Sequence, residues 1–164
     1  MKKRTLLGIV IALLAITPVV ILGVLLSRQN QVPELARQFP VDLLAAHTDW
    51  QVPSEAGPAL LLFYSPDCDH CQNEAEELST HPEFKEQTIY WLSGDTPEAN
   101  RSFQDTYAPE APASFQFLED SDYGVANALE VSMFPTIFIY DAAGHLLHRY
   151  EGETEPERIL SWLD

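Results

Sequence analysis

The chain has 164 residues, of which 46% are hydrophobic and 10% aromatic, values that are ordinary for a folded domain and argue against a disordered body. The chain contains nine Lys and Arg residues and 25 Asp and Glu residues. Four of the nine basic residues lie in the first 28 positions, which contain no acidic residue. The formal charge from residue 29 onward is therefore −20. So acidic a segment repels phosphate backbones, which excludes sequence-independent nucleic-acid binding. Its 136 residues are enough for one domain and too few for two.

An apolar run comes first in the chain. Residues 5–27 are 23 consecutive uncharged residues between Arg4 and Arg28, and about 20 apolar residues suffice to span a bilayer as a helix. A cleaved secretory signal has a shorter apolar region followed by a small-residue cleavage site, and this run does not fit that pattern. We therefore expect residues 1–28 to form a short cytoplasmic terminus and one uncleaved transmembrane helix. The positive-inside rule then places the acidic body outside, on the periplasmic side of the cell membrane.

The next segment, residues 29–58, contains four prolines and is predicted to tether the domain to the membrane. Two short helices, over 35–39 and 41–47, fit between these prolines. Residues 59–64 then form an unbroken apolar run of strand length. Continuous rather than alternating apolarity indicates a strand that is buried on both faces, as in the centre of a parallel sheet.

The rest of the chain, within residues 59–164, alternates between strand-like and helix-like segments. After the first strand we expect helix 68–79, strand 88–92, helix 97–107, strand 115–118, helix 123–129, strands 136–140 and 146–150, and helix 156–163. Asp141 to Gly144 predict the tight loop of a hairpin, and Thr154 is expected to cap the last helix. This order predicts an α/β domain in which helices flank a mixed β-sheet.

Cys68 and Cys71 are the only cysteines, and they form a Cys-Asp-His-Cys motif. A disulfide across so short a loop stabilises a fold little. As half of a zinc site the pair needs two further ligands, and no histidine shows ligand spacing. As a redox pair the cysteines are well placed, because partial positive charge and free N–H groups at a helix N-terminus favour a thiolate. We favour the redox interpretation and expect no metal, with a metal site and a structural staple as the alternatives.

The order of these motifs resembles the thioredoxin superfamily. A strand leads into the Cys-x-x-Cys helix, and residues 133–136 (Met-Phe-Pro-Thr) lead into a strand and hairpin. Within that superfamily the chain resembles the TlpA/ResA branch. The resemblance is carried by Glu74 three residues after Cys71, by the expected anchor, and by the additional strand and helix between the second strand and the Pro-Thr motif. Those proteins are membrane-tethered extracytoplasmic thiol–disulfide oxidoreductases, several of which keep apocytochrome c thiols reduced. The resemblance covers residues 59–163 and implies a thioredoxin-like fold.

The resemblance assigns a role to each matching residue. Cys68 is expected to be the attacking thiolate, and Cys71 the resolving thiol that closes the Cys68–Cys71 disulfide and releases the partner. Pro135 matches the family's cis-proline, although an ordinary proline that opens a strand is trans. Phe134, Pro135 and Thr136 are expected to bind the substrate. No flavin, nicotinamide or haem signature is present, so this disulfide is the redox group that we expect, with no other cofactor.

Glu74 is a candidate acid or base. On a helix it borders the apolar stripe that contains Cys71, whereas Glu76 lies further round. A partly buried carboxyl there would have a raised pKa and could exchange a proton with Cys71 during resolution, so we predict that Glu74 is catalytic. The alternative is a solvated helix acid, because this segment holds several.

Three neighbours of the cysteines are expected to tune the site. A cationic His70 would stabilise the thiolate and make the disulfide a better oxidant. Asp67 and Asp69 flank Cys68, and their negative charge opposes ionisation of that thiol. These effects oppose each other, so the direction of electron flow stays open at this point.

Three features depart from the family pattern. Asp67 precedes the motif where an aromatic residue is typical, and Leu62 stands where thioredoxin itself carries a buried Asp. The Asp-His dipeptide between the cysteines is not the usual pair of a reductase. These departures bear on the direction of electron flow and leave the predicted fold unchanged.

The sequence as a whole predicts an enzyme that exchanges disulfides with protein substrates outside the membrane. A reductase is favoured, and in an oxidising compartment it needs electrons from a donor such as a membrane thiol-transfer protein. The acidic surface predicts partners with a basic or neutral face. The alternatives are a disulfide oxidase or isomerase, a copper- or zinc-handling protein of the same fold, and a binding module without catalysis.

Overall fold

The computed structural model describes residues 17–18, 32–51 and 57–163. By its contacts the chain divides into two units, Met1–Val32 and Pro33–Asp164, and the domain discussed below is the second. The predicted membrane span at residues 5–27 lies almost wholly outside the described residues. Within the described part of the chain, no helix has the length and apolarity that crossing a membrane requires.

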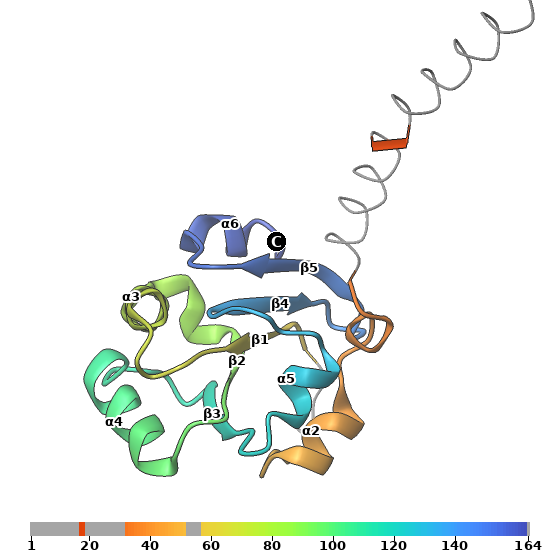
Figure 1. Ribbon diagram of the computed structural model, residues 1–164. Helices are drawn as coiled ribbons and strands as arrows, with labels where there is room; N and C mark the ends of the chain where they lie inside the picture. The colour runs from red at the N-terminus through yellow and green to blue at the C-terminus, as the bar shows by residue number, and fades with distance from the viewer. Residues whose placement is uncertain (1–16, 19–31, 52–56, 164) are drawn as a thin grey trace, which may run out of the picture. The chain divides into compact units, whose positions relative to one another are not determined.

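The described helices and strands follow the predicted alternation. In chain order they are η1 (Glu34–Ala36), α2 (Val41–His47), β1 (Ala59–Phe63), α3 (Asp69–Thr80), η2 (Pro82–Glu86), β2 (Thr88–Ser93), α4 (Pro97–Tyr107), β3 (Phe115–Glu119), α5 (Gly124–Ala128), β4 (Thr136–Tyr140), β5 (Leu146–Glu151) and α6 (Pro156–Leu160). The short 3₁₀ helix η2 is the element that the sequence analysis did not predict. Figure 1 labels most of these elements along the chain.

The strands form one mixed sheet in the order β3-β2-β1-β4-β5. β1 pairs in parallel with β2 and antiparallel with β4, and every residue of β1 is buried. The unbroken apolar run therefore forms a strand covered on both faces, as predicted. Because β4 runs antiparallel to β1, the chain leaves β1 and enters β4 at the same edge of the sheet, where Phe63 pairs with Thr136.

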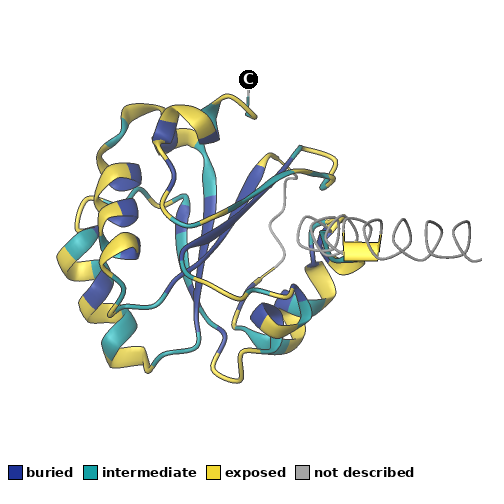
Figure 2. Cartoon of the chain, turned by 45° about the horizontal axis from the view of Figure 1, so that its top comes forward, coloured by how far each residue is buried: buried dark blue, intermediate teal, exposed yellow. Residues whose placement is uncertain are grey.

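Helices cover both faces of this sheet. Figure 1 shows α3 and α4 on one side and α2 and α5 on the other, and Figure 2 shows buried strands between helices whose outer faces are exposed. On the first side the core includes Leu60, Leu62 and Trp91 of the sheet together with Ile159 of α6. The predicted α/β domain with a mixed sheet flanked by helices is confirmed.

Part of the predicted tether belongs to the domain. Ala36 of η1 and Leu44 of α2 are completely buried. The backbone N–H of Phe39 donates to the carbonyl of Gly144 at 2.8 Å, in the loop between β4 and β5. The ring of Phe39 also packs on Tyr140, with centroids 5.2 Å apart. The compact domain therefore starts near residue 33, ahead of its first strand.

Two helix ends differ from the prediction. Thr154 does not cap α6: its hydroxyl donates to the carbonyl of Gly152 at 3.0 Å, and the residue before the helix is Glu155, whose side chain makes no capping bond. Pro156 fixes the start of α6, which ends at Leu160 and continues as turns rather than as helix to residue 163. Sequence patterns locate helix ends less well than helices, because several polar side chains near an end compete to form the cap.

Candidate active site

Cys68 and Cys71 lie where the chain passes from β1 into α3. Cys68 is the N-cap of α3, and its carbonyl accepts hydrogen bonds from the N–H groups of Cys71 at 2.9 Å and Gln72 at 3.0 Å. Cys68 is partly exposed, whereas Cys71 is completely buried, and both are free thiols. The structure thus presents one accessible sulfur at a helix N-terminus with a second sulfur behind it, the arrangement expected from the sequence.

The peptide bond between Phe134 and Pro135 is cis, as predicted, and its loop lies opposite the cysteines. The thiol of Cys68 donates to the carbonyl of Phe134 with 3.7 Å between sulfur and oxygen, although 66 residues separate the two. This contact follows from the sheet topology, because the last residue of β1, Phe63, pairs with the first residue of β4, Thr136. Any chain that reacts with Cys68 approaches the backbone of this loop.

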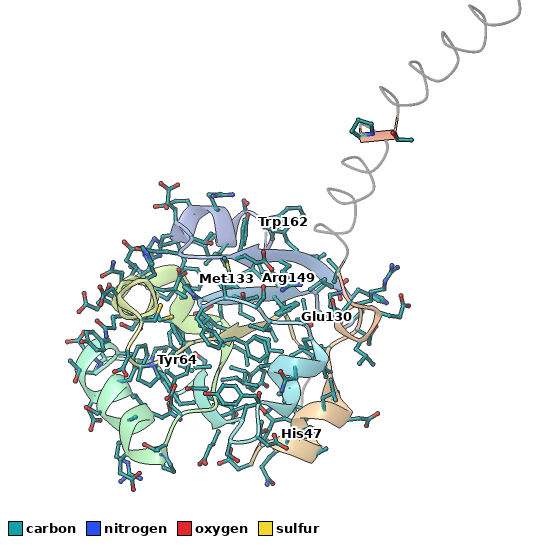
Figure 3. The ribbon with its side chains drawn as sticks, in the orientation of Figure 1. His47, Tyr64, Glu130, Met133, Arg149 and Trp162 are labelled. Atoms are coloured by element: carbon teal, nitrogen blue, oxygen red, sulfur yellow. The ribbon has the colours of Figure 1, made fainter. Side chains whose placement is uncertain are left out.

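Thr136 and Met133 lie on either side of Pro135, Thr136 as the first residue of β4 and Met133 in the loop before it. Thr136 is completely buried, and its hydroxyl donates to the carbonyl of Met133 at 2.8 Å. Met133 is 49% exposed and is labelled in Figure 3. Thr136 therefore shapes the loop from inside, while Met133 offers an apolar side chain to solvent. Thr136 is one of the residues predicted from the sequence to bind the substrate, whereas Met133 is not among them.

The two thiols differ in environment. Burial raises the pKa of Cys71 well above its usual range, and a hydrogen bond with Cys68 and the charge of Glu74 act in the same direction. Cys71 therefore holds its proton in the dithiol form. To resolve a mixed disulfide it must lose that proton to a nearby base.

Glu74 is buried in α3, with 1% of its surface exposed. One carboxyl oxygen, Oε2, accepts a hydrogen bond of 2.8 Å from the backbone N–H of Thr154, while Oε1 has no hydrogen-bond partner among the described residues. Burial raises the pKa of Glu74 to about 8; the hydrogen bond from Thr154 opposes this shift, and the charges of Glu77 and Glu153 add to it. The predicted burial is confirmed and is more complete than expected, so near neutral pH this carboxyl is poised to exchange a proton.

The buried side of α3 explains why Glu74 differs from its neighbours. Cys71, Glu74, Ala75 and Leu78 are buried together on the side that faces the sheet, whereas the adjacent acids Glu76 and Glu77 are exposed. Helical geometry places residues three and four positions apart on one side of a helix. The distinction between Glu74 and Glu76 could therefore be drawn from the sequence.

The three predicted tuning residues are all exposed. Asp67 precedes α3, and Asp69 and His70 form its first turn. The ring of His70 does not stand alone: its Nδ1 atom lies 2.6 Å from Oε2 of Glu153, in the loop after β5. Glu153 is not among the residues predicted from the sequence, because nothing local marks one acid among the several that follow β5 as the partner of a histidine 83 residues earlier.

Tyr64 lies directly behind the motif. It is buried between the sheet and α4, with its ring centroid 4.5 Å from that of Phe103, and Figure 3 shows it on the side of α3 and α4. Burial raises the pKa of Tyr64, and the charges of Asp95 and Cys71 add to this shift, so the phenol stays neutral. Leu62, at the position where thioredoxin carries an Asp, is likewise fully buried. An apolar wall therefore encloses the inner thiol on this side.

No three His, Cys, Asp or Glu side chains among the described residues gather closely enough to hold a metal ion. The groups that the structure brings together at the edge of the sheet are two thiols, one buried carboxyl and one histidine–carboxylate pair. Such groups carry out thiol–disulfide exchange coupled to proton transfer.

Comparisons with known proteins agree with this site. The family profile described as "Thioredoxin-like domain" matches residues 47–164, which is most of the chain. The protein therefore belongs to the thioredoxin-like family, as the arrangement of the Cys-x-x-Cys helix and the cis-proline loop indicates.

Individual relatives cover the same region. The chain is 30% identical over 101 residues to "Protein disulfide isomerase-like 1-1" of Arabidopsis thaliana, a match that covers 62% of this chain but 17% of that much longer relative. DsbF of Mycobacterium tuberculosis has a similar structure, with a TM-score of 0.58 and 24% identity over 66% of this chain and 80% of that one. StoA of Bacillus subtilis has a TM-score of 0.56 and 16% identity over 68% and 86% of the two chains. The structural likenesses establish the fold, and the family membership together with the site supports thiol–disulfide oxidoreductase activity.

Proposed function

We propose that this protein is a membrane-tethered, extracytoplasmic thiol–disulfide oxidoreductase of the TlpA/ResA kind that reduces disulfides in protein substrates. The observation that carries the proposal is the contact between the Cys68 thiol and the Phe134 carbonyl, which sets a reactive sulfur against the backbone of the cis-proline loop. A substrate strand laid along that loop brings its own disulfide to Cys68.

The reaction proceeds in two exchanges. The thiolate of Cys68 attacks one sulfur of a substrate disulfide; a bond forms between the two sulfurs while the substrate's bond breaks, and the other substrate sulfur leaves as a thiolate. The thiolate of Cys71 then attacks the sulfur of Cys68, forms the Cys68–Cys71 disulfide and releases the second substrate thiolate. Two electrons and, overall, two protons pass from the enzyme to the substrate.

Glu74 is the proposed base for the second exchange. Its carboxyl is buried on the same side of α3 as Cys71, and the charge of Glu74 contributes to the raised pKa of that thiol. An ionised Glu74 takes the proton that Cys71 must lose before it can attack. Since the pKa of Glu74 is raised to about 8, the carboxyl is near the midpoint of its titration in mildly alkaline solution.

A reductase in an oxidising compartment needs a source of electrons. A membrane thiol protein that presents a reduced dithiol returns the Cys68–Cys71 disulfide to the dithiol by the same two exchanges in reverse. Apocytochrome c, whose thiols must be reduced before haem attachment, is a client class consistent with the TlpA/ResA resemblance. An anchor at residues 5–27 would keep the domain beside such a donor, and the acidic body favours partners with a basic or neutral face.

Trapping of substrates tests the proposed activity. In the full-length chain, purified in a mild detergent, Cys71→Ser should accumulate a mixed disulfide between Cys68 and a disulfide-bonded protein, whereas Cys68→Ser should accumulate none. Equilibration of the wild type with glutathione then gives a reduction potential. A value near −270 mV, typical of thioredoxin, would support a reductase, whereas one near −120 mV, typical of DsbA, would indicate an oxidase. If no mixed disulfide forms with either variant, the proposed activity is wrong.

Labelling in cells tests the proposed location. A maleimide that does not cross membranes should modify Cys68 in intact spheroplasts, and the protein should sediment with membranes after lysis. Labelling only after the membrane has been broken would place the domain in the cytoplasm and would contradict this part of the proposal.

A further inference from the structure

The loop after β5 contacts three separate parts of the candidate active site. The backbone N–H of Gly152 donates to the carbonyl of Pro135 at 2.8 Å, and that of Thr154 donates to Glu74 at 2.8 Å. Between them, the carboxylate of Glu153 meets the ring of His70. Three consecutive residues thus bind the cis-proline loop, the redox motif and the buried carboxyl of α3.

The contact between His70 and Glu153 is short. Nδ1 of the ring and Oε2 of the carboxylate are 2.6 Å apart, slightly shorter than the roughly 2.7–2.9 Å of a charge-assisted N–H···O hydrogen bond. The ring therefore donates its Nδ1 proton to the carboxylate. The His70 side chain is 70% exposed and that of Glu153 is 32% exposed, so the carboxylate is the more enclosed partner and fixes where the ring lies.

The position of His70 gives this contact its importance. It lies between the two cysteines, where a free imidazolium stabilises the attacking thiolate and thereby favours the dithiol over the disulfide. A carboxylate in contact with the ring cancels its positive charge. The other acids beside the ring are Asp69 and Asp67 on the same segment, both exposed, while buried Glu74 lies further along α3.

We propose that Glu153 is a positioning residue that holds His70 through its Nδ1–H and neutralises its charge, and that this makes the Cys68–Cys71 disulfide a weaker oxidant than the motif histidine alone would make it. This inference rests on the proposed function and addresses the feature that the motif leaves open, the direction of electron flow. The carboxylate favours a reductase even though the Asp-His pair is not typical of one.

The quantity affected is the equilibrium constant for reduction of the Cys68–Cys71 disulfide by glutathione. The Cys68–Cys71 disulfide and two glutathione thiols exchange to give the enzyme dithiol and glutathione disulfide, with two electrons and two protons passing to the enzyme. When a group stabilises the thiolate of Cys68, it shifts this equilibrium towards the dithiol. In mildly acidic solution, where an imidazole is protonated, removal of the Glu153 carboxylate leaves the positive charge of the ring uncompensated and should cause such a shift.

The experiment measures this equilibrium in the full-length chain in detergent at pH 6, below the ordinary imidazole pKa of about 6.5, with thiol trapping to quantify the oxidised fraction. We expect Glu153→Gln to favour the dithiol about three- to tenfold over the wild type. A tenfold change in the equilibrium constant corresponds to about 30 mV in reduction potential. The matched control is Glu155→Gln, which removes the same charge two residues further on, where the side chain makes no capping bond; it should change the constant less than about twofold.

A double-mutant cycle separates the contact from a simple field effect. In a His70→Asn background no imidazole remains to be neutralised, so Glu153→Gln should then change the equilibrium less than about twofold. An equally large change in that background would mean that Glu153 acts by its own charge, and this would overturn the inference. A change in Glu153→Gln no larger than that in Glu155→Gln would overturn it as well.

The wild type distinguishes this inference from the function on which it rests. If the wild-type cysteines form no reversible couple with glutathione, the proposed function fails and the inference fails with it. If the couple is reversible but Glu153→Gln does not change its equilibrium constant in the presence of His70 more than in the His70→Asn background, the inference alone fails.

Discussion

The Oε2 atom of Glu74 accepts a hydrogen bond of 2.8 Å from the backbone N–H of Thr154, which lies 80 residues further along the chain. The bond orients a carboxyl that is otherwise enclosed, and the second oxygen finds no hydrogen-bond partner in the part of the chain that the structure describes. A single neutral donor does not offset the loss of hydration, so burial prevails and the pKa of Glu74 is raised to about 8. Stability and catalysis should therefore both depend on this one carboxyl.

Stability should fall as pH rises between about 5 and 8. In the unfolded chain Glu74 releases its proton near its ordinary pKa of 4.5, whereas in the folded protein it holds the proton up to about pH 8. Between these values the unfolded state binds fewer protons, so the free energy of unfolding falls by about 1 kcal/mol per pH unit from this group. The contribution is fully present below pH 4.5 and is lost through pH 8.

Denaturant unfolding of the wild type and of Glu74→Gln over this pH range measures the effect. The amide of Gln keeps an acceptor for the N–H of Thr154 but does not titrate, so the difference between the two proteins should change with pH by the amount given above. Glu76→Gln, an exposed neighbour on α3 whose charge is not among those that raise the pKa of Glu74, should track the wild type. Parallel curves for the wild type and Glu74→Gln would contradict the raised pKa.

Resolution of the mixed disulfide should depend on the same titration. A preformed disulfide between Cys68 and glutathione should be resolved by Cys71 at a rate that rises with pH through about 8, as Glu74 ionises. In Glu74→Gln we expect this rise to be absent and the rate at pH 8 to be about tenfold lower or more. Stopped-flow release of glutathione between pH 5 and 9 measures this rate, with Glu76→Gln as the control. An unchanged pH–rate profile in Glu74→Gln would remove Glu74 from the mechanism.

Much of the fold could be predicted from the sequence, because the signals involved are local. The unbroken apolar run of residues 59–64 predicts a strand covered on both faces, and β1 is the central strand of the sheet. The Cys-x-x-Cys spacing and the cis-proline at position 135 depend on short motifs that one segment carries by itself. Helical periodicity was enough to separate the buried Glu74 from the exposed Glu76.

The loop after β5 could not be predicted in this way. Its contacts join residues that are about 80 positions apart, and a sequence containing many acids gives no reason to choose Glu153. Thr154 was expected to cap α6, yet its backbone N–H binds Glu74 and its hydroxyl binds Gly152. A Thr shortly before a helix that begins with proline resembles an N-cap in the local sequence. Thr154 does not act as one because this loop packs against α3.

Gly152 should be sensitive to substitution for a purely conformational reason. Its φ is +87°, a region that residues with a Cβ rarely adopt, while an added Cβ would meet no atom within 4 Å. Gly152→Ala should therefore lower the free energy of unfolding by about 1–2 kcal/mol without a clash. Gly57→Ala is the matched control, because there too an added Cβ meets nothing and φ is not positive, so its effect should be near zero. Equal effects in thermal or denaturant unfolding would contradict the conformational account.

Thr136→Val should separate substrate binding from the chemistry of the thiols. Val matches Thr in shape but cannot donate to the carbonyl of Met133, so we expect a loss of about 1 kcal/mol in stability and a looser cis-proline loop. A protein substrate that lies along this loop should show a KM raised several-fold with a smaller change in kcat, whereas exchange with glutathione, which is too small to span the loop, should change little. Ser132→Ala, at an exposed neighbouring position, provides the control. If Thr136→Val slowed both reactions equally, Thr136 would act on the reactivity of Cys68 and not on the surface that receives the substrate.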